Sequence, residues 1–294
     1  VVGEISLHPY EGARRHAAVF GMSVHDAYQG RGVGTALLEA CLDLADRRLL
    51  LDRVELNVYP DNEPALRLYR KFGFQEEGTM RRAALRDGRL VDLLAMARIR
   101  GRALGPRRRD QNPGPLQQGR PPSSGLVAGP GVRIRPVRVA DAEAIHTIRR
   151  QRQVARETGL PPSLSVEQVR KELAGLGPAD HVLVAEVDGQ VVGMAHLRVL
   201  GHRRGHVGQL RLLAVLDRFQ GRGIGSRLAA ALVNLGTNWL GVRRFEAEIP
   251  AGNARALQLL HRLGFRSEVR KRAALLHDGV LADTILLARL AGEG

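Results

Sequence analysis

Two glycine-rich strings have the residue types and spacing that most clearly predict chemistry in this sequence. QGRGVG runs from Gln29 to Gly34, and QGRGIG runs from Gln220 to Gly225, 191 positions later. Glycines at alternate positions remove Cβ atoms and permit positive φ, so successive backbone N–H groups can converge on an anion. A helix-like segment follows each string, and its unpaired first-turn donors and dipole would strengthen such a site. The strings therefore predict the binding of a phosphate or pyrophosphate group.

Two common phosphate-binding patterns do not fit these strings. The pattern GxxxxGK[ST] requires a lysine, and none follows Gly34 or Gly225. The dinucleotide pattern GxGxxG lies near the start of a βαβ unit, with an acidic residue about 20 positions on. Here the spacing is GxGxG and at least two strand-like segments come first. Both alternatives are excluded, and Arg31 and Arg222 would add positive charge at the rim of the site.

A second pattern follows each string at the same distance. NVYPDNEPALRLYRKFGF spans 57–74 and EIPAGNARALQLLHRLGF spans 248–265. The two strings and these two segments resemble the Q/RxxGxG/A loop and the "N, A, LY, GF" segment of the GCN5-related N-acetyltransferase (GNAT) superfamily. The first copy, with GTMRRAALRDGRLVDLLAMAR at 78–98, is most similar to the branch that includes L-amino-acid N-acyltransferases. The resemblance covers nearly all of the chain outside 100–131.

The resemblance implies acetyl-CoA as co-substrate and direct transfer of its acetyl group, in a ternary complex, to a primary amine of a small molecule or protein. The strand before each string would pair with the pantetheine arm where the sheet splays open, the string would hold the pyrophosphate, and an asparagine heading the next helix would contact the cofactor. No metal is implied. The residues so assigned are Met22, Val24, Gln29, Gly30, Arg31, Gly32, Val33, Gly34, Thr35 and Asn62, and Leu213, Val215, Gln220, Gly221, Arg222, Gly223, Ile224, Gly225, Ser226 and Asn253.

The departing thiolate needs a proton, which in this superfamily commonly comes from the tyrosine of the "LY" pair. The first copy has Leu68-Tyr69, so the resemblance assigns Tyr69 as the catalytic acid; the alternative is a core tyrosine. The second copy has Leu259-Leu260 at this position. His261 is turned about 100° round the helix from Leu260 and is a poor substitute.

Other reactive side chains give weaker indications. Glu4 and Glu55 are candidate general bases, although each fits a surface carboxylate better. Cys41 is expected in the core, and Trp239 is expected to pack at a helix end. His202 and His206 flank a turn, so we do not expect them to bind a metal.

The chain is an internal repeat. With an offset of 191, Gly73-Phe74 aligns with Gly264-Phe265, and Asp87-Gly88 aligns with Asp278-Gly279. Val1-Val2-Gly3 aligns with residues 191–193, so the first copy begins at the third strand of the fold. We therefore expect a fragment of a longer tandem protein whose first strand is an unpaired edge.

The predicted fold class is α/β, with a mixed sheet of α+β character, in two tandem GNAT domains. Residues 1–99 form an incomplete domain that lacks the first strand, two helices and the second strand; 100–131 form a flexible Pro/Gly/Arg-rich linker; 132–294 form a complete domain. In the first copy we expect a strand at 17–24 and a helix at 35–48. In the second we expect strands at 132–139, 181–199 (a hairpin at Asp188-Gly189), 205–215 and 244–249, helices at 141–155, 165–176, 226–240 and 253–262, and a closing hairpin at Asp278-Gly279.

Composition limits the classes of protein. The 294 residues are 44% hydrophobic and include one cysteine, which excludes an internal disulfide framework. We expect no signal peptide, because the start VVGEISLHPYEG has no basic flank followed by an apolar stretch. No apolar run reaches the ~20 residues that would span a bilayer, and the two observations predict a soluble cytoplasmic protein. The net charge of +15 lies entirely in the linker and second half. Such a surface can attract RNA, membranes or polyanionic ligands such as a phosphorylated cofactor. The alternative is a coding bias toward arginine at solvated positions, because 42 of the 45 basic residues are Arg, so nucleic-acid binding is not the expected role.

Three hypotheses remain open from the sequence. The first copy is catalytic and the second is a degenerate partner that still binds cofactor; or the second copy catalyses without the tyrosine; or the second copy is a non-catalytic acyl-CoA sensor or a module that docks RNA or ribosomes. The sequence leaves the acceptor and the oligomeric state open.

Overall fold

The computed structural model of the chain describes residues 1–100, 131–158, 163–277 and 279–293. The predicted linker lies outside these residues apart from its two ends. Of the described residues, one compact unit contains 1–84, 88–100, 268–277 and 279–285, and the other contains 85–87, 131–158, 163–267 and 286–293. The first unit therefore includes a segment of the second copy.

The first unit is built around a mixed sheet with the strand order β1-β2-β3-β5-β4-β11. Strands β1 and β2 are antiparallel, β2 and β3 are parallel, and β11 joins β4 in the antiparallel sense at Val269 and Gly78. Strand β1 ends this order, so its outer edge has no strand partner among the described residues, as predicted. The elements of the first copy are β1 (Gly3–Pro9), β2 (Ala17–Val24), α1 (Val33–Asp43), β3 (Arg53–Val58), α2 (Glu63–Lys71), β4 (Gln75–Arg86) and β5 (Arg89–Ile99).

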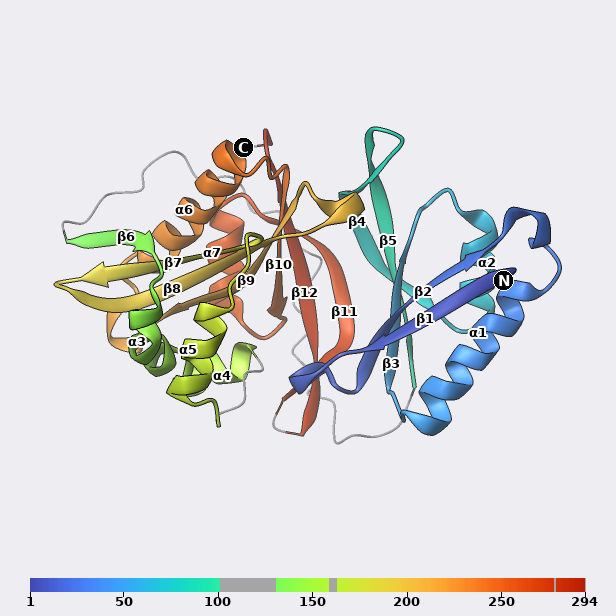
Figure 1. Cartoon of the computed structure of the whole chain (residues 1–294), viewed down its shortest axis with the longest axis horizontal. Coiled ribbons are helices and arrows are strands. Elements are labelled where there is room, and N and C mark those ends of the chain that lie inside the picture. The colour runs from blue at the N-terminus through green and yellow to red at the C-terminus, as the bar shows by residue number, and fades with distance from the viewer. Residues whose placement is uncertain (101–130, 159–162, 278, 294) are drawn as a thin grey trace. The chain divides into compact units, whose positions relative to one another are not determined.

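Helix α1 lies along β1 (Figure 1). Its buried residues, Leu38, Cys41 and Leu42, recur at helical spacing and join a core with Phe20 of β2. This places Cys41 in the core, as predicted. The helix was predicted to run to residue 48, but its last part is a π-helical turn, Leu44–Arg48, in which Asp46 receives two hydrogen bonds of 2.9 and 2.8 Å from Arg98.

The second unit has the strand order β12-β10-β9-β8-β7-β6. Helices α3 and α5 pack together, with α3 on β8, and α6 also packs on β8. The elements of the second copy are β6 (Val132–Pro136), α3 (Ala142–Arg149), α4 (Arg152–Thr158), α5 (Val166–Ala174), β7 (Asp180–Val187), β8 (Gln190–Val199), β9 (Val207–Val215), α6 (Ile224–Trp239), β10 (Arg244–Pro250), α7 (Ala254–Arg262), β11 (Arg266–His277) and β12 (Val280–Leu290).

The predicted elements of the second copy agree with these to within two residues, with two exceptions. The strand predicted over 132–139 ends at Pro136, and Val139–Asp141 is a 3-10 turn. The single helix predicted over 141–155 is two helices, α3 and α4. At the break, the side chain of Gln151 donates to the carbonyls of Ile148 and Val215, and accepts from the backbone N–H of Asp217. Contacts with a distant strand end therefore interrupt a segment whose sequence spacing is helical.

Local turn and cap signals are confirmed. Ser165 and Gln168 form a capping box at the start of α5. Asp188 and Gly189 both have positive φ (48° and 77°), as a tight hairpin turn requires. Asp278 lies outside the described residues.

Two further findings concern single residues and membranes. Trp239 does not pack at its helix end as predicted: it is 80% exposed. No helix in the part of the chain that the structure describes has the length and apolar content that a bilayer crossing needs.

Candidate functional site

The two glycine strings adopt the same backbone geometry. Gly30 and Gly32 have φ of 72° and 83°, and Gly221 and Gly223 have φ of 79° and 75°. A Cβ at any of the four would find open space, so backbone conformation rather than crowding requires glycine there. Gly32 and Gly223 are the N-caps of α1 and α6, so each loop turns directly into a helix N-terminus.

Each loop presents a continuous row of unpaired donors. The backbone N–H groups of residues 30–35 donate to no described residue, and the same is true of residues 221–226. The first donor with a partner is Ala36 in one copy and Arg227 in the other, and each donates to the N-cap carbonyl. Six N–H groups at the positive end of a helix dipole form a site for a phosphate-type anion. The residues fit the pyrophosphate that the sequence predicts.

The glutamine of each string holds the loop in place. Gln29 Nε2 donates to the carbonyl of Val24 (3.3 Å) and to Asp26 (2.9 Å). Gln220 Nε2 donates to the carbonyl of Val215 (3.0 Å) and to Asp217 (2.9 Å). The side chain of this residue ties the loop to the end of the preceding strand, while the N–H groups that follow it in the loop stay unpaired.

The last glycine of each string serves packing. A Cβ on Gly34 would lie 3.4 Å from Leu68 of α2, and one on Gly225 would lie 3.3 Å from Leu259 of α7. The start of each long helix thus approaches the helix that carries Tyr69 or Leu260. Glycine at this position links the loop to the second motif.

The strand before each loop has an open edge. Strands β2 and β3 pair only as far as Val19 and Glu55, and β9 and β10 pair only as far as Leu210 and Ala247. Beyond these points β2 continues to Val24 and β9 continues to Val215. The splayed sheet that the sequence predicts is therefore present in both copies, and the open stretches include Met22, Val24, Leu213 and Val215.

The copies differ by one residue in this strand. β1 and β2 pair without interruption, whereas the pairing of β8 and β9 shifts between His196–Leu212 and Leu197–Leu210. Arg211 is the unpaired extra residue of a β-bulge, and it is exposed. The sequence contains this signal, because the repeat offset is 190 at Gly3 and 191 at Gln29.

The sheet face beside the open edge also differs. In the second copy the cross-strand pairs Met194–Ala214 and His196–Leu212 lie there, and all but His196 are buried. The equivalent pairs of the first copy are Glu4–Ser23 and Ser6–Gly21, and all four residues are exposed. We call these four residues the open face. The open face contains no large apolar side chain, whereas three of the four residues of its counterpart are buried and apolar.

The two asparagines cap helices. Asn62 Oδ1 accepts from the N–H of Ala65 (3.2 Å) at the start of α2, and Asn253 Oδ1 accepts from Ala256 (3.0 Å) at the start of α7. The oxygen of each amide is therefore used within the fold. The amide nitrogen donates to no described residue.

Tyr69 has a buried ring and an accessible hydroxyl. The residue is 7% exposed, and its ring packs edge-on against Phe20 and Phe74, with centroids 5.7 and 5.9 Å away. The hydroxyl makes no hydrogen bond with a described residue. Its oxygen is not fully buried, so solvent reaches it. Burial raises the pKa of Tyr69. Leu260, its counterpart, is 2% exposed and purely a core residue.

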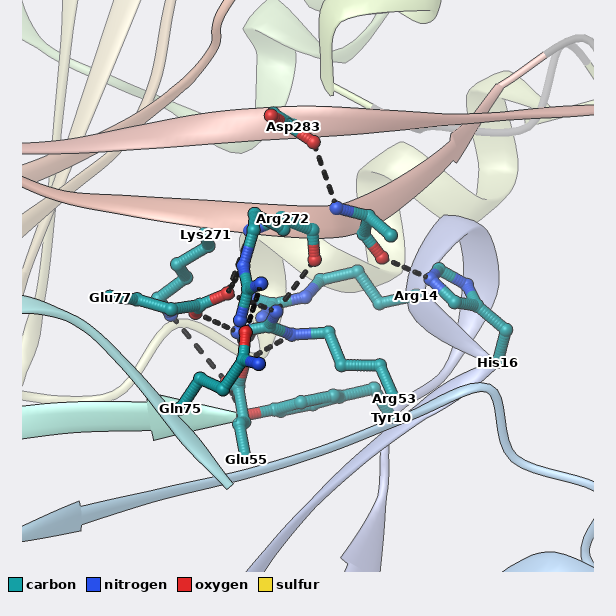
Figure 2. Close-up of polar contacts among 11 residues, drawn as sticks. Tyr10, Arg14, His16, Arg53, Glu55, Gln75, Glu77, Lys271, Arg272 and Asp283 are labelled. Carbon is teal, nitrogen blue, oxygen red and sulfur yellow. Dashed lines mark hydrogen bonds and ion pairs between the residues drawn. The ribbon is translucent and has the colours of Figure 1, made fainter. Parts of the chain in front are cut away.

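Glu55 is neither a surface carboxylate nor an available base. It is buried and receives hydrogen bonds from Tyr10 (2.7 Å), Arg14 (3.2 Å) and Arg53 (2.8 Å), with Lys271 3.5 Å away (Figure 2). Burial opposes ionisation of Glu55, but Lys271, Arg53 and Arg14 outweigh it and hold the pKa far below its usual range. Glu4, the other candidate, lies on the open face.

Within the described residues, no group of three or more histidine, cysteine or acidic side chains could hold a metal ion.

Comparison with known proteins gives a family. A family model described as the acetyltransferase (GNAT) family matches residues 1–74 and 145–265. The chain is 42% identical over 101 residues to the L-amino acid N-acetyltransferase AaaT of Escherichia coli, which covers 34% of this chain and 62% of that protein. It is 48% identical over 61 residues to the N-alpha-acetyltransferase RimI of Mycobacterium tuberculosis, covering 21% of this chain and 36% of that protein. The chain thus spans less than two thirds of the length of either relative.

A solved structure shows the same fold. The spermidine N-acetyltransferase from Vibrio cholerae, in complex with CoA and spermine, superposes with a TM-score of 0.52 over 56% of this chain and 98% of that chain, at 15% identity. At this identity the similarity extends to the fold alone.

Proposed function

The chain belongs to the acetyltransferase (GNAT) family, and we propose from this membership and from its two glycine loops that it is an acetyl-CoA-dependent N-acetyltransferase. The observation that carries the proposal is the row of six unpaired backbone N–H groups in each loop, 30–35 and 221–226. Each row lies at a helix N-terminus and next to an open strand edge. A pyrophosphate with an extended amide-containing arm matches both features.

The assignment of groups follows from this arrangement. The loop N–H groups bind the pyrophosphate, with Arg31 or Arg222 at the rim. The unpaired edges of β2 and β9 bind the pantetheine amides as an added strand would. Asn62 and Asn253 donate their free amide N–H groups to the cofactor.

In the first copy Tyr69 is the proton donor to the leaving thiolate. Its ring is fixed by Phe20 and Phe74. Its accessible hydroxyl is protonated at neutral pH, since the ordinary pKa of tyrosine is about 10 and burial raises the pKa of Tyr69 further. The helix that carries it touches the loop through Leu68 and Gly34. Much of the rate comes from holding amine and thioester together in a ternary complex.

The acceptor is a primary amine of a small molecule or protein. The open face lies beside the unpaired edge of β2, and its Glu4 carboxylate suits a cationic ammonium group. The similarity of the chain to AaaT, an L-amino acid N-acetyltransferase, favours a small acceptor.

The two loops can be tested separately in the full chain. Asp tolerates positive φ better than most residues, so Gly32→Asp and Gly223→Asp should keep the loop while placing a carboxylate beside the pyrophosphate. By calorimetry the wild type should bind two acetyl-CoA molecules. In each variant the affinity for acetyl-CoA at the substituted loop should fall tenfold or more, while the other loop binds as in the wild type.

Matched controls come from the hairpin turns. Gly88 and Gly189 have φ of 74° and 77° and open space at Cβ, as the loop glycines have. Gly88→Asp and Gly189→Asp should leave both sites unchanged. Loop variants that bind like the wild type would contradict the assignment of the loops. Binding at both loops without release of free CoA thiol in the presence of amines would leave a non-catalytic acyl-CoA-binding module.

A further inference from the structure

A histidine–aspartate pair lies on the sheet of the second copy. Nε2 of His196, on β8, is 2.9 Å from Oδ1 of Asp180, at the start of β7. A carboxylate only accepts hydrogen bonds, so Nε2 carries the ring proton and Nδ1 has a free lone pair. Nδ1 makes no hydrogen bond with a described residue, and it is not fully buried. The ring therefore offers a proton acceptor that solvent can reach, although only 13% of the side chain is exposed.

The ring points to the face opposite α6. A Cβ on Gly193 would lie 3.2 Å from Leu228 of α6, so residues 194 and 196, which alternate with it, point the other way. There the charge of Arg149, on α3, acts on His196. His196 pairs with Leu212 at the β-bulge of Arg211, where the open edge of β9 begins.

Burial, together with two nearby arginines, keeps the imidazole of His196 neutral. Burial lowers the pKa of His196, and Arg211 of β9 and Arg149 of α3 add to this, against the opposing effect of Asp180 of β7. Burial would raise the pKa of Asp180, but the hydrogen bond from His196 and the charge of Arg198 on β8 lower it. At neutral pH the pair is a neutral imidazole held by an ionised carboxylate, which is the form of an oriented general base.

The first copy has no such pair. The position of His196 is occupied there by Ser6, and the position of Tyr69 is occupied in the second copy by Leu260. The proton-transferring side chains of the two copies therefore differ in place and type. The second copy lacks the acid but has a candidate base.

We propose that His196, oriented by Asp180, is the general base of a second acetyl-transfer site in residues 132–294; this rests on the proposed function. Nδ1 takes one proton from the acceptor's ammonium group. The freed nitrogen lone pair forms the C–N bond at the acetyl carbon as the C–S bond breaks. The second proton of the nitrogen passes to the thiolate, and the imidazolium returns its proton to water.

One test needs neither a variant nor a known acceptor. Diethyl pyrocarbonate carbethoxylates neutral accessible imidazoles, and mass spectrometry measures the rate at each histidine of the full chain. Saturating acetyl-CoA should slow modification of His196 at least tenfold and leave that of the exposed His202 unchanged. Calorimetry on the same sample reports binding. Acetyl-CoA that binds the second loop without protecting His196 would overturn the base and leave the proposed function standing.

The second test measures turnover in the Gly32→Asp chain, in which only the second loop binds. Release of CoA thiol with a panel of primary amines should show kcat/KM decreasing as pH falls below about 6.5, since the base must be neutral. His196→Gln, which retains a donor toward Asp180, should lower kcat/KM about 10²-fold or more and abolish this limb at unchanged acetyl-CoA affinity.

Two results would count against the base in this second test. A His196→Gln chain that keeps the acidic limb, or a Gly32→Asp chain that is inactive while the wild type is active, would overturn it. Failure of the wild type to bind acetyl-CoA at either loop would instead overturn the proposed function, and this inference with it.

Discussion

The carboxylate of Glu77 accepts hydrogen bonds from the backbone N–H (2.9 Å) and the guanidinium (3.2 Å) of Arg272, 195 positions along the chain (Figure 2). Glu268 accepts the equivalent bonds from the backbone N–H (3.3 Å) and guanidinium (2.9 Å) of Arg81. Within the first unit, strands β4 and β11 are thus joined by reciprocal contacts between equivalent residues of the repeat, the pattern of an isologous interface.

Glu77 should be essential to the stability of the first unit. It also receives two hydrogen bonds, of 2.9 and 2.6 Å, from Arg53, whose side chain is 1% exposed. Glu77→Gln leaves that buried charge without its main partner, so the free energy of unfolding should fall by about 3 kcal/mol or more in urea denaturation. Glu76→Gln is the control, because its pair with Arg70 is exposed and contributes about 0–1 kcal/mol. Equal losses in the two variants would refute the role of Glu77.

The buried Glu55 should make stability depend on acid. Its folded pKa is lowered, so the unfolded state binds a proton first as pH falls. The stabilisation from its charge is complete above about pH 4.5 and decreases below it. The difference in unfolding free energy between the wild type and Glu55→Gln should be largest at pH 7 and shrink by pH 3. Glu4→Gln, on the open face, should show no such change; a parallel trend would point to general acid denaturation.

Tyr69→Phe tests the acid of the first copy, best in the Gly223→Asp chain. The ring contacts with Phe20 and Phe74 remain, so stability and acetyl-CoA affinity should change little. Turnover should fall about 10²- to 10⁴-fold. Since the acid must be protonated, kcat should decrease as pH rises through the raised pKa of Tyr69, and the variant should lack this alkaline limb. Unchanged turnover in steady-state kinetics would exclude Tyr69 as the donor.

Gly34→Val tests the link between the loop and the second motif. The Cβ alone would lie 3.4 Å from Leu68, so the extra methyl groups should push α2 away and destabilise the chain by about 1–3 kcal/mol. Acetyl-CoA affinity should fall as well, since the loop moves with the helix. Gly21→Ala is the control, because its Cβ meets only Ser6 at 3.7 Å. If Gly34→Val has the unfolding free energy and the acetyl-CoA affinity of the wild type, the link between the loop and the second motif is wrong.

The sequence by itself determined the repeat, most helices and strands, and the two loops. These depend on local chemistry: alternating glycines dictate the left-handed backbone of Gly30 and Gly32, Asn62 caps the helix it precedes, and Asp188-Gly189 makes a tight turn. Backbone N–H groups bind anions whatever the neighbouring side chains are, so the site that they form could be read from spacing.

Tertiary structure alone decided which side chains are free to react and where distant contacts interrupt a helix. Glu55 has the residue type of a base, but Arg53 on the same strand and Arg14 and Lys271 from distant elements neutralise it. Gln151 breaks a helix because it bonds to a strand end 64 positions away. His196 meets Asp180 only because β7 and β8 pair in one register. Burial and pairing join residues far apart in the chain, and neither is encoded in local spacing.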